Sequence, residues 1–186
     1  MKELSLNILD IAENSVKAGA SLTEIKIEET ETELTLTITD DGCGMSEETL
    51  LSVTNPFYTT RTTRSVGLGI PLLIMSAEQT GGSVKITSKK ADDTDSSHGT
   101  EVIAHYYKNH LDFTPLGDVI STITTLIQGH PDTDFLFCHK KEGKEVILDT
   151  RSVKEILDDV PINTYEVIKW IEENLTEQYI DFQNKK

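Results

Sequence analysis

A short turn rich in aspartate and glycine, Asp40-Asp41-Gly42-Cys43-Gly44-Met45, holds the residue types with the clearest chemical use in this sequence. A carboxylate at Asp40 could accept a hydrogen bond from an exocyclic amine, such as that of a purine base. Glycines at positions 42 and 44 would let the backbone turn sharply and approach a flat ring. Asp-Gly turns also join ordinary β-hairpins, so the pattern alone leaves a plain turn as the alternative.

A second glycine pair, Gly67-Leu68-Gly69, begins a predicted helix that continues to about residue 79. The first N–H groups of a helix lack partners, and the helix dipole favours a negative charge there. The pair is therefore a candidate phosphate-binding turn, with a flexible loop end as the alternative. It has neither the P-loop pattern nor the strand-glycine-helix order of a dinucleotide fold.

The first helix is predicted over residues 3–18 from its apolar positions, and Asn7, Asp10, Asn14 and Lys17 form one polar stripe along it. A solvated helix face would explain this stripe. It would also suit a ligand, because Asn14 offers an oxygen to a hard cation and Lys17 offers a charge to a phosphate. Asp10 adds a carboxylate one turn away.

The hydrophobic pattern predicts a β-sheet that would position these residues. Residues 22–29 and 33–40 alternate with period two and predict an antiparallel hairpin, and further strands are expected at 83–88 and 100–107. A short helix is expected at 46–53, and the segment 55–66 is a hydroxyl-rich, cationic loop.

The composition changes near residue 109, where we place a domain boundary: 1–108 for the first domain and 109–186 for a small α+β unit. The second unit is expected to contain a helix at 116–128 and a hairpin pairing 134–139 with 144–149. Two helices should follow, with capping boxes at Ser152/Glu155 and Asn163/Glu166. The fold class is α+β.

The charge limits the partners. The 186 residues include 32 acidic and 17 basic side chains, for a formal net charge of −15. Such a field repels nucleic acids and anionic membranes, so we expect neither as a partner. The two cysteines are too few for a disulfide framework, and no apolar run reaches the roughly 18 residues of a membrane span. We therefore expect a cytoplasmic protein.

The order of these motifs resembles the GHKL superfamily, which includes gyrases, chaperones, histidine kinases and mismatch-repair ATPases. The resemblance covers about residues 1–107. It rests on the run from Asp10 to Ser21, the turn from Asp40 to Met45, Asn55-Pro-Phe-Tyr-Thr-Thr-Arg61, Gly67-Leu68-Gly69 and Gly99-Thr100. The first helix looks most like mismatch-repair proteins, whereas the segment ending at Arg61 looks like histidine kinases and anti-sigma kinases.

The resemblance implies a Bergerat ATP-binding fold, a two-layer α/β sandwich with a mixed sheet and helices on one face. By similarity, the cofactors are ATP or ADP with Mg²⁺. Asn14 would coordinate the metal, Lys17 would meet phosphate, and Asp40 would bind the adenine amine. The remaining expected binding residues are Gly42, Gly44 and Met45 at the base pocket, Arg61, Gly67, Leu68 and Gly69 toward the phosphates, and Thr100 at the adenine end.

The resemblance leaves two activities open. The kinase-like segment favours a stand-alone signalling kinase module that phosphorylates a separate protein. Asp10 keeps hydrolysis open, because hydrolytic branches carry a Glu general base at that position. The alternative is therefore an ATP-hydrolysing or ATP-sensing switch that regulates a protein partner. A homodimer remains open as well.

Overall fold

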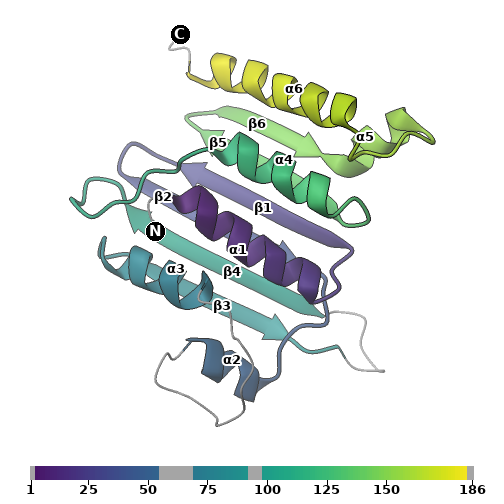
Figure 1. Cartoon of the computed structure of the whole chain (residues 1–186). Coiled ribbons are helices and arrows are strands. Elements are labelled where there is room, and N and C mark those ends of the chain that lie inside the picture. The colour runs from purple at the N-terminus through teal and green to yellow at the C-terminus, as the bar shows by residue number, and fades with distance from the viewer. Residues whose placement is uncertain (1–2, 55–68, 92–97, 184–186) are drawn as a thin grey trace.

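A six-stranded mixed sheet with helices on one face makes up the computed structural model (Figure 1), which describes residues 3–54, 69–91 and 98–183. The strand order is β3-β4-β2-β1-β5-β6. The strands are β1 (Leu22–Glu29), β2 (Glu33–Asp40), β3 (Ser83–Lys89), β4 (Gly99–Tyr107), β5 (Asp134–Lys141) and β6 (Lys144–Asp149). The helices are α1 (Leu4–Lys17), α2 (Glu47–Thr54), α3 (Gly69–Glu78), α4 (Val119–Gly129), α5 (Thr150–Leu157) and α6 (Tyr165–Gln183). The α+β prediction is confirmed.

The predicted hairpin forms with β1 antiparallel to β2, and Thr23 lies opposite Asp40. β5 then adds to the other side of β1 in parallel, with Ile25 opposite Phe137. The second unit predicted from the sequence thus shares one sheet with the first. Over this extension α4 lies beside α1, and α6 packs against α4 and β6 (Figure 1).

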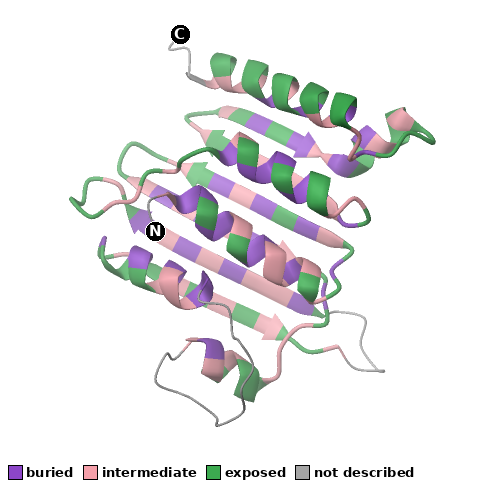
Figure 2. Ribbon diagram, viewed as in Figure 1, coloured by how far each residue is buried: buried purple, intermediate pink, exposed green. Residues whose placement is uncertain are grey.

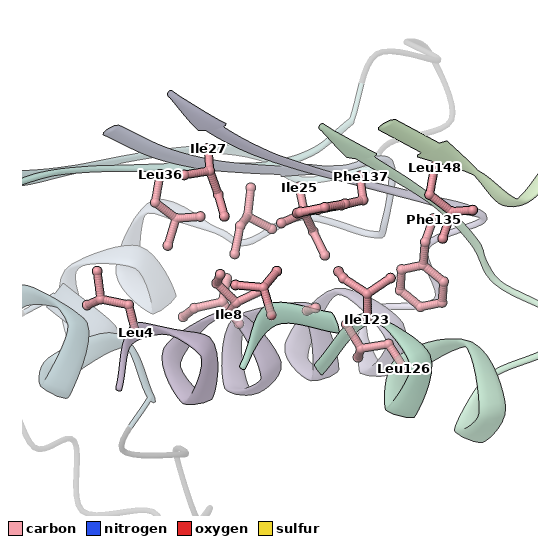
Figure 3. Close-up of a cluster of buried hydrophobic side chains, with 14 of the residues drawn as sticks. Leu4, Ile8, Ile25, Ile27, Leu36, Ile123, Leu126, Phe135, Phe137 and Leu148 are labelled. Atoms are coloured by element: carbon pink, nitrogen blue, oxygen red, sulfur yellow. The ribbon is translucent and has the colours of Figure 1, made fainter. Parts of the chain in front are cut away.

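One face of the sheet supplies the core. Alternate side chains of the strands are buried, as the period-two pattern predicts for a sheet covered on one side. Figure 3 shows Leu4 and Ile8 of α1 and Ile123 of α4 facing this layer. The other face has no helix over it in the described residues, and its side chains are half-buried or exposed (Figure 2).

The first N–H groups of α1 find their hydrogen-bond acceptors in a segment distant in sequence. The N–H groups of Leu4 and Ser5, at the start of α1, donate to the carbonyls of Pro115 and Leu116 at 2.9 and 2.8 Å. The α4 N-cap, Asp118, accepts from the Ser121 N–H at 2.9 Å. The loop before α4 therefore fixes α1, because it satisfies donors that a helix cannot satisfy alone.

The predicted capping box at Ser152 is wrong. Asp149 caps α5 by accepting from the Arg151 N–H at 3.0 Å, so this helix begins two residues before Ser152. α6 begins at Tyr165, two residues after the predicted cap at Asn163. In both cases the spacing located the helix and missed its first turn.

Asn7 is buried, which a solvated helix face does not explain for this residue of the α1 polar stripe. It is 1% exposed, and neither polar atom of its side chain has a hydrogen-bond partner among the described residues. Asp10 and Lys17 on the same stripe are exposed. The stripe therefore runs from the packed interior to the surface.

A network of polar side chains lies at the Glu29 end of β1. The ring nitrogens of His139 lie 2.9 Å from the Glu29 carboxylate and 2.9 Å from the Tyr179 hydroxyl, and Lys108 donates to the second oxygen of Glu29. Burial raises the pKa of the Glu29 carboxyl, but the bonds from His139 and Lys108 outweigh burial and bring the pKa to about 2. The network joins β1, β5, α6 and the segment after β4.

None of the described helices combines the length and apolar character that crossing a membrane requires.

Candidate functional site

A cavity of about 250 Å³ lies at the Asp40 end of β2, opposite the Glu29 end of the neighbouring β1. This volume is near the lower limit for small-molecule sites and suits a ring system rather than a whole nucleotide. It is mainly apolar, with a few polar side chains among its walls. The lining residues are Ile11, Asn14, Ser15, Ala18, Ile38, Asp40, Gly44, Met45, Val53, Ile70, Thr100 and Val102.

Asp40 is the carboxylate of this cavity. One of its oxygens accepts from the Ser15 hydroxyl at 2.7 Å, and the other accepts from the Gly42 N–H at 3.0 Å. Both donors are neutral. An ionised carboxylate has about four acceptor positions, so two bonds orient Asp40 and leave acceptor capacity for a ligand amine.

The glycine turn beside Asp40 is tightly enclosed. A Cβ at Gly42 would lie 2.8 Å from the Ala18 Cβ, and one at Gly44 would lie 1.9 Å from the Lys89 carbonyl oxygen. Gly44 also has a φ of +62°, which favours glycine. The turn can pass between α1 and the end of β3 only because these two residues lack side chains.

Asp41, the next residue, stabilises the local backbone instead. Its carboxylate accepts from the backbone N–H groups of Ser21 and Leu22 at 2.7 and 2.9 Å. Burial raises the pKa of this carboxyl, but the hydrogen bonds from Leu22 and Ser21 prevail and hold it below its usual value. Asp41 thus ties the turn to the start of β1.

Thr100 is the cross-strand neighbour of Asp40 on β4, and it lies within a hydroxyl cluster. The Ser88 hydroxyl is 2.9 Å from the Thr100 hydroxyl and 3.0 Å from the Gly99 carbonyl, and it accepts from the Met45 N–H at 2.8 Å. Ser88 therefore links the end of β3 to the glycine turn and positions Thr100.

On the α1 side, Asp10 and Gly69 lie together. A Cβ at Gly69, the first residue of α3, would be 3.0 Å from the Asp10 Cβ and 3.6 Å from one carboxylate oxygen. Asn14, one turn further along α1, reaches the cavity, whereas Lys17 is exposed at the end of the helix. Asp10 thus adjoins the start of α3, and Asn14 lies at the cavity.

The structure brings most of the predicted site residues that it describes to one place. Asn14, Asp40, Gly44, Met45 and Thr100 line the cavity, and Gly42 adjoins it. Arg61, Gly67 and Leu68 lie outside the described residues, so their predicted contacts with phosphate remain predictions. The nucleotide-binding roles of the others are likewise predictions from their types and positions.

Sequence reasoning missed three hydroxyls. By its spacing Ser15 falls on the apolar side of α1, yet its hydroxyl donates to Asp40 across 25 positions of sequence. A serine at an apolar position of an amphipathic helix was the available signal. Ser88 and Thr23 gave no signal. Thr23 is buried opposite Asp40, and its hydroxyl has no partner in the described structure.

The mixed sheet, the helices on one face and the cavity at the Asp40 end define the class of GHKL-type ATPase domains. The chain belongs to the family of histidine kinase-, DNA gyrase B- and HSP90-like ATPases, whose sequence model matches residues 2–110. This confirms the resemblance drawn from the motifs.

Similar proteins include one kinase and two solved structures. Sporulation kinase C of Bacillus subtilis (strain 168) is 28% identical over 89 residues, which make up 48% of this chain and 20% of that kinase. The Aquifex aeolicus MutL ATPase domain complexed with ADP matches 100% of this chain and 99% of its own, with a TM-score of 0.54 and 13% identity. The N-terminal domain of a DNA repair protein has a TM-score of 0.60 and 14% identity, over 80% of this chain and 53% of that one. At these identities the two structures establish the shared fold.

Proposed function

We propose that this protein binds Mg-ATP at the Asp40 cavity and acts as a stand-alone signalling kinase module on a separate protein. The observation that carries the proposal is the Asp40 carboxylate, which is oriented by Ser15 and Gly42 and faces a mainly apolar cavity. An adenine ring would fill the cavity and donate its amine to Asp40. Membership of the ATPase family and the ADP complex of MutL support this ligand.

The remaining part of the nucleotide would lie along α1 toward α3. The Asn14 side chain supplies a neutral oxygen, which suits Mg²⁺, and the described residues contain no cluster of three or more His, Cys, Asp or Glu side chains that could hold a metal alone. The ion would therefore need phosphate oxygens as further ligands. When bound, Mg²⁺ offsets the phosphate charge during phosphoryl transfer.

The net charge of −15 makes local donors necessary, because the overall field opposes a nucleotide. The backbone N–H groups of Gly69 and Ile70, in the first turn of α3, are suited to a phosphate. Lys17 adds a positive charge at the end of α1. These groups make an anion tolerable beside Asp10 and Asp40.

Transfer of phosphate to a protein is tested with purified chain, labelled ATP and candidate partners. We expect label on a partner, and no label when the Asp40→Asn variant replaces the wild type. The similarity to sporulation kinase C motivates this reaction. If no partner is labelled while the chain still binds ATP, the kinase activity is excluded and the proposed nucleotide site stands.

ATP hydrolysis is the second candidate, and the position of Asp10 favours it. This carboxylate is exposed and lies against Gly69, where α3 begins, so it could accept a proton from a water near the terminal phosphate. Asp10→Asn should then reduce turnover about 100-fold and change ATP affinity by no more than about threefold.

Glu13→Gln is the matched control for Asp10→Asn. Glu13 belongs to the same helix, but its carboxylate lies 2.7 Å from a ring nitrogen of His130, which follows α4. Turnover should remain within about twofold of the wild type. If Asp10→Asn retains full turnover, Asp10 is not the base and the hydrolytic alternative loses its support.

A further inference from the structure

The region from α5 through α6 has an exposed and strongly acidic surface. Residues 155–181 include eight acidic side chains and one lysine, Lys169, which lies 3.7 Å from Glu173. Figure 2 shows the outward side of α6 as exposed. The acidic residues are Glu155, Asp158, Asp159, Glu166, Glu172, Glu173, Glu177 and Asp181, and all are exposed.

Large apolar side chains are exposed among these charges. Tyr165 is 74% exposed and Trp170, the single tryptophan of the chain, is 49% exposed. Ile156 in the last turn of α5 is 80% exposed, and Val160 between α5 and α6 is 50% exposed. Single exposed apolar residues are ordinary, but four within 15 positions, two of them of the aromatic types that anchor interfaces, indicate a docking surface.

These side chains are not displaced members of the core. α6 already buries its inner side through Ile171 and Leu175, both at 0% exposure. Trp170 falls instead on the stripe of Glu166, Glu173 and Glu177, since spacings of four, three and four residues place side chains on one side of a helix. An aromatic residue is thus set within a row of carboxylates.

The neighbouring sheet edge is closed to an added strand. The Gln178 side chain accepts from the Ile147 N–H at 2.9 Å and donates to the Ile147 carbonyl at 3.1 Å. These are outward backbone groups of β6, the last strand of the sheet. A partner here would therefore contact side chains rather than extend the sheet.

We propose that the outer surface of α5 and α6, comprising Ile156, Val160, Tyr165, Trp170 and the acidic residues named above, docks a basic amphipathic helix of another protein. Lysine or arginine side chains of that helix would meet the carboxylates, and its apolar side would cover Trp170 and Tyr165. A second copy of this chain would bring like charges together. The surface involves no nucleotide, so the proposal does not depend on the ATP site.

Trp170 is also the reporter for the test. The probe is a synthetic helical peptide of leucine and lysine, roughly five turns long, titrated into the full chain at about 0.15 M salt. We expect a saturable blue shift of tryptophan emission with one peptide bound per chain, since the indole leaves water. A peptide of the same composition in scrambled order should bind at least about tenfold more weakly, because it lacks a continuous apolar side.

Variants separate a specific surface from general attraction to an acidic protein. By calorimetry, Trp170→Ala and the double variant Glu173→Lys/Glu177→Lys should each weaken peptide binding about tenfold or more. The control is Glu47→Lys/Glu48→Lys on α2, which makes the same charge change at the far end of the sheet from α6 (Figure 1) and should stay within about twofold.

Three results would overturn the proposal. The first is an unchanged Trp170 emission at saturating peptide, and the second is an equal loss of binding in the α2 control. The third is self-association of the chain in sedimentation that Trp170→Ala abolishes, because the surface would then be occupied by a second copy.

Discussion

At the Glu29 end of the sheet, charged and polar side chains bond to one another, whereas at the Asp40 end a carboxylate is held by only two neutral donors within the described residues. Glu29 contacts both Lys108 and His139, and His139 continues to Tyr179. Asp40 contacts the Ser15 hydroxyl and the Gly42 N–H. The first arrangement stabilises the fold, and the second retains acceptor capacity for a ligand.

The proposed nucleotide cavity is smaller than the hollow at the other end of the sheet. The larger hollow, about 1130 Å³, lies beside Glu29, and the Asp40 cavity is about 250 Å³. The larger hollow contains groups already bonded to each other, so a ligand there would compete with internal bonds. The bonding of the polar groups, rather than the volume, is what favours the Asp40 cavity as the proposed binding site.

The largest expected effect comes from closing the glycine turn at the Asp40 end. Gly44→Ala places a Cβ against the Lys89 carbonyl oxygen at a φ of +62°, so we expect a loss of about 3 kcal/mol or more in unfolding free energy. Denaturant titration measures it. Gly19→Ala is the control: its φ is +73° with nothing within 4 Å of the added Cβ, and it should cost only about 1 kcal/mol. Equal losses would show that the turn is not tightly enclosed.

A smaller effect is expected from the Glu29 network, and it depends on pH. The pKa of Glu29 is lowered from 4.5 to about 2 in the folded protein, so its ionised form stabilises the fold above pH 4.5, and this contribution is lost as the pH falls toward 2. Glu29→Gln should cost about 2 kcal/mol at pH 7. Denaturant titrations across pH should show the difference from wild type shrinking below about pH 4.5. A difference that is constant with pH would contradict the ionic role.

The smallest effect tests the last link of that network. Tyr179→Phe removes the hydroxyl beside the buried His139 ring and should cost about 1 kcal/mol in unfolding free energy. Tyr165→Phe changes a tyrosine that is 74% exposed and should change stability by less than about 0.5 kcal/mol. Thermal unfolding of both variants compares them directly. ATP affinity should be unchanged in both, because neither residue lines the Asp40 cavity.

The Asp40 end was predictable from sequence to the extent that its motifs are local. The Asp-Gly-x-Gly turn after a strand and the spacing of Asp10 and Asn14 on one helix follow from short-range geometry. The bond from Ser15 to Asp40 does not, because it depends on how α1 packs on β2. Burial of Asn7 has the same origin, since periodicity places a residue on a side of a helix without saying what covers that side.

The Glu29 end was less predictable because its contacts join residues that are far apart in sequence. Glu29 and His139 are 110 positions apart, and they meet because β5 pairs in parallel with β1. The hairpin of β5 and β6 was apparent from its alternation, but alternation does not specify which strand it joins. Alternation accordingly gives no sign that His139 links β5 to β1 and α6.

The central claim, that the Asp40 cavity holds the base of ATP, is tested most directly by calorimetry of ATP and ADP binding, with and without Mg²⁺. The proteins compared are wild type, Asp40→Asn and Asp118→Asn, the last making the same charge change at the α4 N-cap, where asparagine also caps well. We predict that Asp40→Asn weakens both nucleotides about 10- to 100-fold, the worth of a hydrogen bond to a charged group, and that Asp118→Asn stays within about twofold. Undiminished ATP binding by a folded Asp40→Asn variant would contradict the account.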